Sequence, residues 1–331
     1  MVKKVIIIII TAAFAAGLIS GMEFKRRERV VRGHQRAVTS VVFSPDSTLV
    51  LSTSFDRTLK IWKAGSGELV RTLTGHGDWV STAAFSPDGK YIASAGHDRN
   101  VRIWRTETGQ VVRILSGHSH YVSSAAFSSD GKSLYSVSPA AKTLLIHETN
   151  TGKIIRKLVF DKSGLLEIAV FSPDRKILAA GIGKHVHFFS TESGKAVSIF
   201  DKDKHIAGVK SIAFARDGKY MITGGGSTID MLDGSIKIWE TESGKLVKSI
   251  EAHESDVFIA LTSDTRYIIS ASTDRTVKIW NFKTCTLEKK LQSDYEAFWC
   301  IAVSPDNRVM SAGTSESGFV VLWDTLSLGL Y

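Results

Sequence analysis

Residues 75–104 read GHGDWVSTAAFSPDGKYIASAGHDRNVRIW, and this stretch decides the fold because its features recur along the chain. It holds a Gly-His pair, a Ser-Pro-Asp-Gly turn, an Asp-Arg turn and a closing tryptophan, Trp104. Between the turns, apolar and polar residues alternate over short runs, a pattern that is typical of half-buried β-strands. The stretch therefore predicts three short antiparallel strands joined by tight turns.

The pattern repeats along the chain at a period of about 42 residues. His34, His76 and His118 are 42 residues apart. A further apolar run after each closing residue, such as residues 67–73, predicts a fourth strand. Four short strands cannot bury both of their faces alone, so the units must stack around an axis. The residues that close the units are Trp62, Trp104, His147, Phe189, Trp239, Trp280 and Trp323.

These residues resemble the WD-repeat family, whose marks are a Gly-His, an Asp in the turn before the third strand and a closing Trp-Asp. The closing Asp is present only as Asp324 after Trp323. The resemblance covers about residues 28–324, and it implies an all-β, seven-bladed β-propeller. We place this propeller domain at residues 23–331.

The N-terminal part of the propeller is expected to close the ring. Only eight residues follow Trp323, which leaves blade 7 without most of a fourth strand. Residues 27–32, RERVVR, directly precede Gly33-His34, as a fourth strand does before Gly75-His76. We therefore expect residues 27–32 to pair with the third strand of blade 7 and remove an exposed strand edge.

Four blades share a His, a hydroxyl residue, an Asp and a Trp at fixed spacing, which superficially matches a catalytic triad. A catalytic nucleophile occurs once per site, whereas this set recurs with a tryptophan attached. The family resemblance implies instead a buried hydrogen-bonded chain from indole to carboxylate, so we expect no enzyme, no catalytic residue and no cofactor. The four sets are His34, Ser52, Asp56 and Trp62; His76, Ser94, Asp98 and Trp104; His205, Thr223, Asp233 and Trp239; and His253, Ser270, Asp274 and Trp280.

The remaining blades depart from this pattern, and we expect them to hold by apolar packing rather than by polar chains. Either a binding face or neutral loss in a redundant ring could account for the departures. The substituted positions are Ala140, Ala141 and His147 in blade 3, Lys162, Gly183 and Phe189 in blade 4, and Asp294 and Ser317 in blade 7.

The loops that carry the Gly-His and the Asp turn should share one face of a propeller, here called the top face. Positions three after the His, or one before the Asp, should point outward there. In blades 1 to 3 these are Ala37, Phe55, Trp79, His97 and Tyr121. Exposed aromatic side chains are the usual anchors of an interface, so we expect protein or peptide partners at Phe55, Trp79, His97 and Tyr121. The alternative is that each ring packs singly against its neighbouring blade.

Several features bear on other classes of ligand. An insertion at 224–235 should lengthen a top-face loop of blade 5. His185 and His187 share one face of a strand, as two metal ligands would, but no further ligand accompanies them, so we expect an ordinary strand surface. Cys285 and Cys300 are too few for a disulfide framework, and we expect both to stay reduced.

The formal net charge of +9 favours acidic partners without naming one. Lys and Arg are spread through every blade, and no dense basic stripe occurs outside residues 25–32, so we expect no nucleic acid. We expect a monomeric scaffold for protein–protein interaction. The alternatives are a propeller enzyme or cofactor-binding protein, and a basic surface that binds nucleic acid or an anionic membrane.

Residues 1–22 form a leader in which Lys3 and Lys4 precede an apolar run and then small residues. This order is that of a secretory signal peptide, so we expect export to the periplasm or the outside of the cell. The alternative is an uncleaved membrane anchor, because residues 5–22 as a helix would span roughly 27 Å, close to the ~30 Å of hydrocarbon. The basic residues at 25–29 favour the cytoplasmic side and so weaken the export interpretation.

Overall fold

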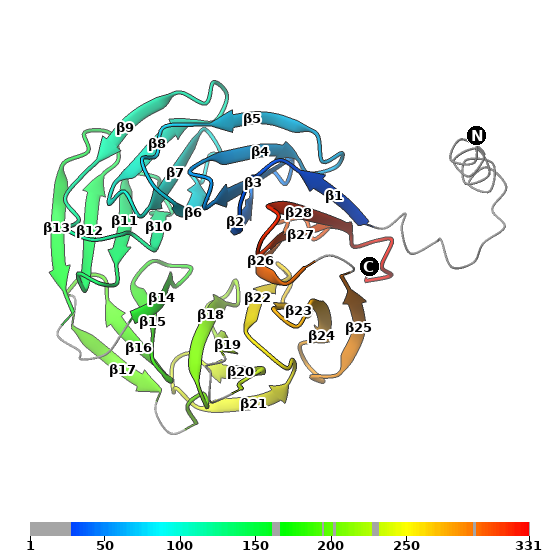
Figure 1. The fold of residues 1–331 in the computed structure, drawn as a ribbon. Helices are drawn as coiled ribbons and strands as arrows, with labels where there is room; N and C mark the ends of the chain where they lie inside the picture. Colours follow the sequence, from blue (N-terminus) through cyan, green and yellow to red (C-terminus); the bar gives the residue numbers. More distant parts are fainter. Residues whose placement is uncertain are drawn as a thin grey trace, which may run out of the picture.

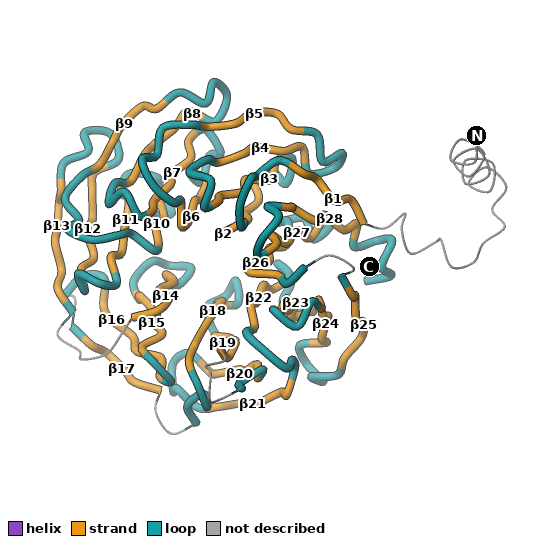
Figure 2. Tube along the Cα trace, viewed as in Figure 1, coloured by secondary structure: helices purple, strands orange, loops and turns teal. Residues whose placement is uncertain are grey.

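The structure is a computed structural model that describes residues 28–160, 166–193, 195–200, 203–226, 232–293 and 296–330. Over these residues the chain forms strands and turns without any helix (Figure 2). The strands make seven four-stranded antiparallel sheets arranged as blades around a central axis (Figure 1). The prediction of an all-β, seven-bladed propeller is confirmed. In this described part of the chain, no helix is long and apolar enough to cross a membrane.

The predicted leader at 1–22, together with Lys162 and Asp294, lies outside the described residues. The strands of the first half of the ring are β1 (Glu28–Arg32), β2 (Val38–Phe43), β3 (Leu49–Ser54), β4 (Leu59–Lys63), β5 (Leu69–Leu73), β6 (Val80–Phe85), β7 (Tyr91–Gly96), β8 (Val101–Arg105), β9 (Val111–Leu115), β10 (Ser124–Phe127), β11 (Ser133–Ser138), β12 (Thr143–Glu148) and β13 (Ile154–Val159). Those of the second half are β14 (Leu166–Phe171), β15 (Ile177–Ile182), β16 (His185–Ser190), β17 (Ala196–Phe200), β18 (Gly208–Phe214), β19 (Tyr220–Gly226), β20 (Ser235–Glu240), β21 (Leu246–Glu251), β22 (Val257–Leu261), β23 (Tyr267–Ser272), β24 (Thr276–Asn281), β25 (Leu287–Gln292), β26 (Phe298–Val303), β27 (Val309–Thr314) and β28 (Phe319–Asp324).

The ring is closed as predicted, by a strand from the N-terminal part of the propeller. Blade 7 has the order β1-β28-β27-β26, and β1 lies beside β28 in Figure 1. The two strands pair antiparallel, with Glu28 opposite Trp323 and Arg32 opposite Phe319. Val31 packs on an apolar cluster that includes Trp62 of blade 1, so β1 also contributes to the contact between the last blade and the first.

The apolar core lies between neighbouring blades as well as within them. One cluster combines Leu51, Ile61 and Leu73 of blade 1 with Val80 and Trp104 of blade 2, and all five are almost fully buried. This packing explains why inner strands such as β3 and β4 are buried over nearly their whole length, since each blade presents one face to each neighbour. The blades therefore form a rigid disc rather than independent sheets.

A repeated arginine links the outer strand of one blade to the next blade. In each case the guanidinium donates to a backbone carbonyl in the turn between the third and fourth strands of the neighbouring blade. The contact could not be predicted from the pattern within one repeat, because the donor and the acceptor belong to different repeats. The pairs are Arg29 with Gly65, Arg71 with Glu107 at 2.9 Å, Arg113 with Thr151 at 2.9 Å, and Arg156 with Glu192.

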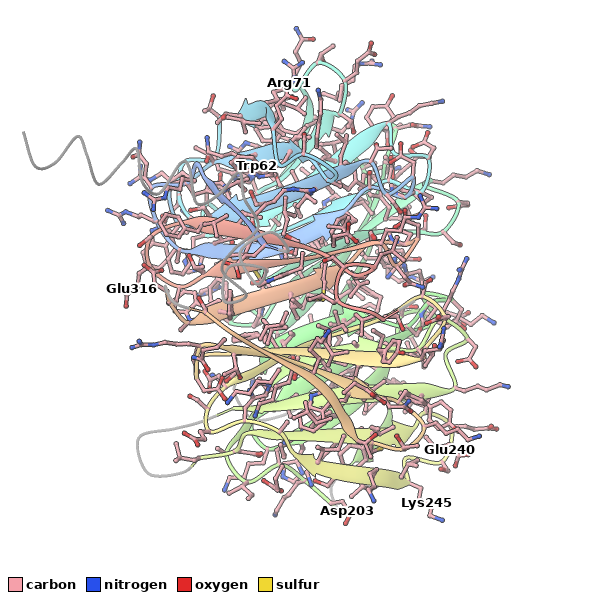
Figure 3. The ribbon with its side chains drawn as sticks, turned by 90° about the vertical axis from the view of Figure 1, so that its right-hand side faces the viewer. Trp62, Arg71, Asp203, Glu240, Lys245 and Glu316 are labelled. Atoms are coloured by element: carbon pink, nitrogen blue, oxygen red, sulfur yellow. The ribbon has the colours of Figure 1, made fainter. Side chains whose placement is uncertain are left out.

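The disc has two faces, which a side view separates (Figure 3). Glu316, in the loop between β27 and β28, lies at one face, which is the top face defined above. Glu240 and Lys245, at the turn between β20 and β21, lie at the opposite, bottom face. The first strand of each blade lines the central axis, so the top-face loops of neighbouring blades meet around the opening.

Candidate functional site

Blade 2 shows how the His, Ser, Asp and Trp of one repeat are connected. The indole Nε1 of Trp104 donates to Ser94 Oγ at 2.8 Å, and Ser94 Oγ lies 2.6 Å from His76 Nε2. His76 Nδ1 lies 2.9 Å from Asp98 Oδ2. The chain joins the third strand of the blade, through its second strand, to both top-face loops.

The same chain is present in blades 1, 5 and 6, with the threonine of blade 5 replacing serine. Trp62 donates to Ser52 at 2.8 Å, Trp239 to Thr223 at 2.9 Å and Trp280 to Ser270 at 2.9 Å. The imidazoles of His34, His205 and His253 lie 2.7 to 2.8 Å from these hydroxyls. Their Nδ1 atoms lie 2.9 Å from Asp56, 3.0 Å from Asp233 and 2.8 Å from Asp274.

The carboxylate fixes the direction of every bond in the chain. Burial alone would raise the pKa of Asp98, but hydrogen bonds from His76 and the Gly77 amide and the charge of Arg102 hold that pKa below its usual range. An ionised carboxylate only accepts, so His76 Nδ1 donates to Asp98 and its Nε2 accepts from the Ser94 hydroxyl. Burial also lowers the pKa of His76, which favours the neutral ring.

The hydroxyls of the four chains cannot serve as nucleophiles. Ser52, Ser94, Thr223 and Ser270 are all completely buried. Each oxygen already receives an indole N–H and bonds to an imidazole, so no substrate carbonyl can approach it. These side chains instead tie the strands of a blade to its top loops.

Five aromatic side chains from four blades form a continuous row on the top face, which we call the aromatic row. Its members, in order around the axis, are Trp299, Phe55, Trp79, His97 and Tyr121. Phe55 stacks on Trp79 with ring centroids 4.4 Å apart, and His97 stacks on Tyr121 at 4.9 Å. Trp79 and His97 are 5.1 Å apart and tilted, and Trp299 meets Phe55 edge-on at 5.7 Å. The rings therefore do not pack singly against neighbouring blades; they pack on each other.

Backbone hydrogen bonds hold the row in place. The Phe55 amide donates to Ala37 O at 3.1 Å, and the His97 amide donates to Trp79 O at 2.8 Å. Gly96, directly before His97, has no space for a side chain, because a Cβ there would lie 2.0 Å from Trp79 O. The glycine thus lets the end of β7 approach the Trp79 backbone closely, which brings the His97 and Trp79 rings together.

The row remains partly open to solvent. Trp79 is 36% exposed, and the other four rings are half-buried. The expectation that Ala37 points outward is wrong, because Ala37 is only 5% exposed. Blade 1 therefore contributes Phe55 alone.

The rule that places a top-face residue three positions after the histidine does not predict Trp299, because blade 7 has no histidine at that position. The register of the first strand of blade 7 explains instead how Trp299 reaches the row. Phe298 occupies the position of Val38 and Val80, and a β-bulge follows it, so that the register passes from Phe298 to Cys300. The bulge leaves Phe298 in the core against Trp323, while Trp299 stays half-buried beside Phe55.

The other candidate features were placed as follows. The insertion at 224–235 was predicted to lengthen a top-face loop. Its first three residues, 224–226, instead extend strand β19, so that part of the prediction is wrong. Residues 227–231 lie outside the described residues. The His185 and His187 rings are 6.2 Å apart. Within the described ranges, no group of three or more His, Cys, Asp or Glu side chains could hold a metal ion.

Comparison with known proteins adds the family. The sequence pattern described as "WD domain, G-beta repeat" matches six segments, residues 25–63, 67–105, 109–145, 194–240, 244–281 and 285–324. Together these segments cover well over half of the chain. The chain belongs to the WD-repeat family. WD-repeat propellers typically mediate protein–protein interaction.

The similar WD-repeat proteins are mostly much longer than this chain. It is 30% identical over 171 residues to Protein TPR3 of Oryza sativa subsp. japonica, covering 49% of this chain and 14% of that protein. It is 33% identical to a probable coatomer subunit beta' of Schizosaccharomyces pombe, covering 41% and 16% respectively. A guanine nucleotide-binding protein subunit beta-like protein of Encephalitozoon cuniculi is 29% identical, covering 46% of this chain and 44% of that protein.

The family pattern leaves residues 146–193 unmatched, which include most of blade 4. The side chains inside this blade differ from those of the other repeats. Phe189 replaces the tryptophan and packs on Phe160 with centroids 4.6 Å apart. Ala180, opposite His187 in the sheet, stands where the serine would be. Of the polar chain, the tryptophan and the serine are thus replaced in blade 4 by the apolar side chains of Phe189 and Ala180, in line with the expected apolar packing.

Blades 3 and 7 were expected to hold by apolar packing rather than by the polar chain; both lack the complete chain, but each keeps a polar link beside its apolar packing. In blade 3, His118 Nε2 lies 2.8 Å from Ser136 Oγ, although His147 replaces the tryptophan. Burial, with His147 and Lys157 nearby, lowers the pKa of His118 to about 4. In blade 7, Glu296 accepts the Ser317 amide at 2.8 Å and the Ser317 hydroxyl, so a carboxylate from the first loop takes over the linking role.

Proposed function

We propose that this WD-repeat propeller is a non-enzymatic scaffold that binds a partner protein through the aromatic row. The observation that carries the proposal is the row itself: five rings from four separate blades lie side by side on one partly exposed surface. Large aromatic side chains at such positions contribute most of the binding energy in protein interfaces.

The rigidity of the scaffold supports the same proposal. Each ring of the row is held by its neighbours and by backbone hydrogen bonds, so little side-chain entropy remains to be lost when a partner binds. The burial of the Ser and Thr hydroxyls in the four polar chains supports a non-enzymatic role. One similar protein is named as a probable coatomer subunit, and another is named as similar to a subunit of a guanine nucleotide-binding protein, which fits a protein that works in a complex.

The test is affinity capture with a double variant, Trp79→Ala with Tyr121→Ala. The matched control is Val112→Ala with Ile155→Ala, because these two residues are also exposed apolar side chains but lie on the outer strands β9 and β13. We expect the row variant to keep its melting temperature within a few degrees and to lose the partner captured by the wild type. Equal capture by both variants would show that the row is not the binding surface.

We propose further that the leader directs the propeller out of the cytoplasm, which rests on the order of charged, apolar and small residues in 1–22. The experiment is cell fractionation of the full chain and of a chain starting at Glu23. We expect the full chain in the periplasmic or secreted fraction, and the shorter chain in the cytoplasm. Full-chain protein that stays in the membrane fraction would instead identify an anchor.

A further inference from the structure

Stacking covers one face of four rings in the aromatic row, because Phe55 and Trp79 stack on each other, and so do His97 and Tyr121. The edge of an aromatic ring carries partial positive charge, whereas its face carries partial negative charge. The stacked rings therefore present a larger share of weakly positive edge to a partner than unstacked rings would.

The row also supplies hydrogen-bond donors. Among the described residues, neither the indole Nε1 of Trp79 nor that of Trp299 makes a hydrogen bond. An indole nitrogen donates only, so each can be satisfied by a carboxylate or a carbonyl oxygen of a bound chain. The row thus selects for acceptor groups.

Charged residues next to the row act in the same direction. Arg57 and Arg99 are exposed and follow Phe55 and His97 by two residues, in the same turns. The carboxylates nearest to them in sequence, Asp56 and Asp98, are already bonded to the histidines of their blades. The charged groups that these two turns expose to solvent are therefore the two guanidinium groups, since the side chains of Asp56 and Asp98 are only 7% and 9% exposed.

The rest of the charge around the row is mixed, and this sets the orientation of a bound chain. In the loop before β2, Arg36 is exposed, and in the loop before β6, Asp78 is partly exposed. Glu316 lies on the top face at the blade 7 end, near Trp299 in the ring order. The positive region is consequently over blades 1 and 2.

We propose, building on the function proposed above, that the occupant of the aromatic row is an acidic peptide segment of a partner protein, bound in an extended conformation. Its carboxylates pair with Arg57 and Arg99, and its oxygen atoms accept the free indole N–H groups. Adjacent rings are 4.4 to 5.7 Å apart, so at roughly 3.3 Å per residue a segment of about six residues spans the row.

Nucleic acid carries negative charge too, but it fits this surface poorly. Proteins that bind single strands stack bases on open aromatic faces. Here a neighbouring ring covers one face of each of Phe55, Trp79, His97 and Tyr121, which reduces the face area on which a base could stack.

The first experiment selects ligands without assuming their sequence. A phage library of random 12-residue peptides is panned against the immobilised full chain and, in parallel, against Trp79→Ala. We expect the wild type to enrich peptides rich in Asp and Glu, and the variant to lose that enrichment. Enrichment of neutral or basic peptides that still depends on Trp79 would overturn the acidic-segment inference and leave the binding surface intact. Enrichment that does not depend on Trp79 would overturn the proposed function itself.

The second experiment measures the affinity of the best selected peptide by fluorescence anisotropy. Asparagine tolerates positive φ, so Arg57→Asn and Arg99→Asn suit backbones at φ of 70° and 64°. We expect each variant to weaken binding about tenfold, as for the loss of one charge-assisted contact. Lys132→Asn, at an exposed bottom-face turn, is the control and should change Kd less than about twofold. Equal Kd values for all four proteins, or tighter binding of a 20-residue thymidine oligonucleotide than of the peptide, would contradict the inference.

Discussion

Three buried serines give a graded test of the polar chains. Ser94, Ser136 and Ser311 are completely buried on the second strands of blades 2, 3 and 7. Ser94 and Ser136 occupy equivalent positions, whereas Ala312 stands at that position in blade 7 and Ser311 directly precedes it. Their hydroxyls differ in hydrogen bonding. Ser94 bonds to both Trp104 and His76, Ser136 bonds to His118 only, and Ser311 has no partner among the described residues.

Replacing each serine by alanine should therefore cost different amounts of stability. Leaving one buried polar group unsatisfied costs about 1–3 kcal/mol. Ser94→Ala orphans two groups, the Trp104 indole and the His76 Nε2, so we expect a loss of about 4 kcal/mol. Ser136→Ala orphans one, His118 Nε2, and should cost about 2 kcal/mol by the same rule. Ser311→Ala orphans none and should stay within about 0.5 kcal/mol of the wild type.

The assay is the free energy of unfolding from urea denaturation, followed by tryptophan fluorescence and by circular dichroism. The three substitutions remove the same atom from completely buried side chains, so the small cavities left behind are similar in size and the differences report mainly on hydrogen bonding. The order Ser94, then Ser136, then Ser311 is the prediction. Similar losses at Ser94 and Ser311 would refute the assignment of stability to the hydrogen-bonded chains.

Further predictions concern the ring closure, the blade 3 histidines and a buried thiol. A chain starting at Gly33 should unfold at a markedly lower temperature than one starting at Glu23, because it lacks the strand that pairs with β28; equal melting temperatures would contradict the closure. The free energy of unfolding should fall by about 3 kcal/mol between pH 6.5 and about 4, because the pKa of His118 is about 4 in the folded chain and about 6.5 in the unfolded chain. In the His118→Gln variant, the free energy of unfolding should depend less steeply on pH. Burial raises the pKa of Cys300 to about 12, and its thiol contacts Val38 O, so iodoacetamide should label it only after unfolding.

The repeat could be predicted from the sequence because its marks are local. Gly75-His76, Asp98 and Trp104 lie within 30 residues, and the bonds between them close within one blade. The closure by residues 27–32 followed from the same pattern, since a fourth strand precedes every Gly-His.

Two of the features that were missed depend on contacts between repeats, and the third is a substitution within blade 7. Nothing near Trp299 in the sequence shows that its ring meets Phe55, since 243 residues separate them. In the sequence, outer-strand arginines such as Arg71 resemble solvent-exposed strand residues, because their carbonyl partners lie in the next blade. Glu296 took over a linking role that the family pattern assigns to an Asp at another loop, so no position-by-position comparison could predict it.

The most direct test of the proposed interaction surface is site-specific photocrosslinking of the partner in cells. A photoreactive amino acid is placed at Ser119, which is exposed in the top loop of blade 3 beside Tyr121, or at Lys132, which is exposed at a bottom turn of the same blade. The two positions share one blade and differ only in the face they sample. We predict a crosslinked partner from position 119 and none from position 132. A crosslink from position 132 with none from position 119 would contradict the assignment of the binding surface to the top face.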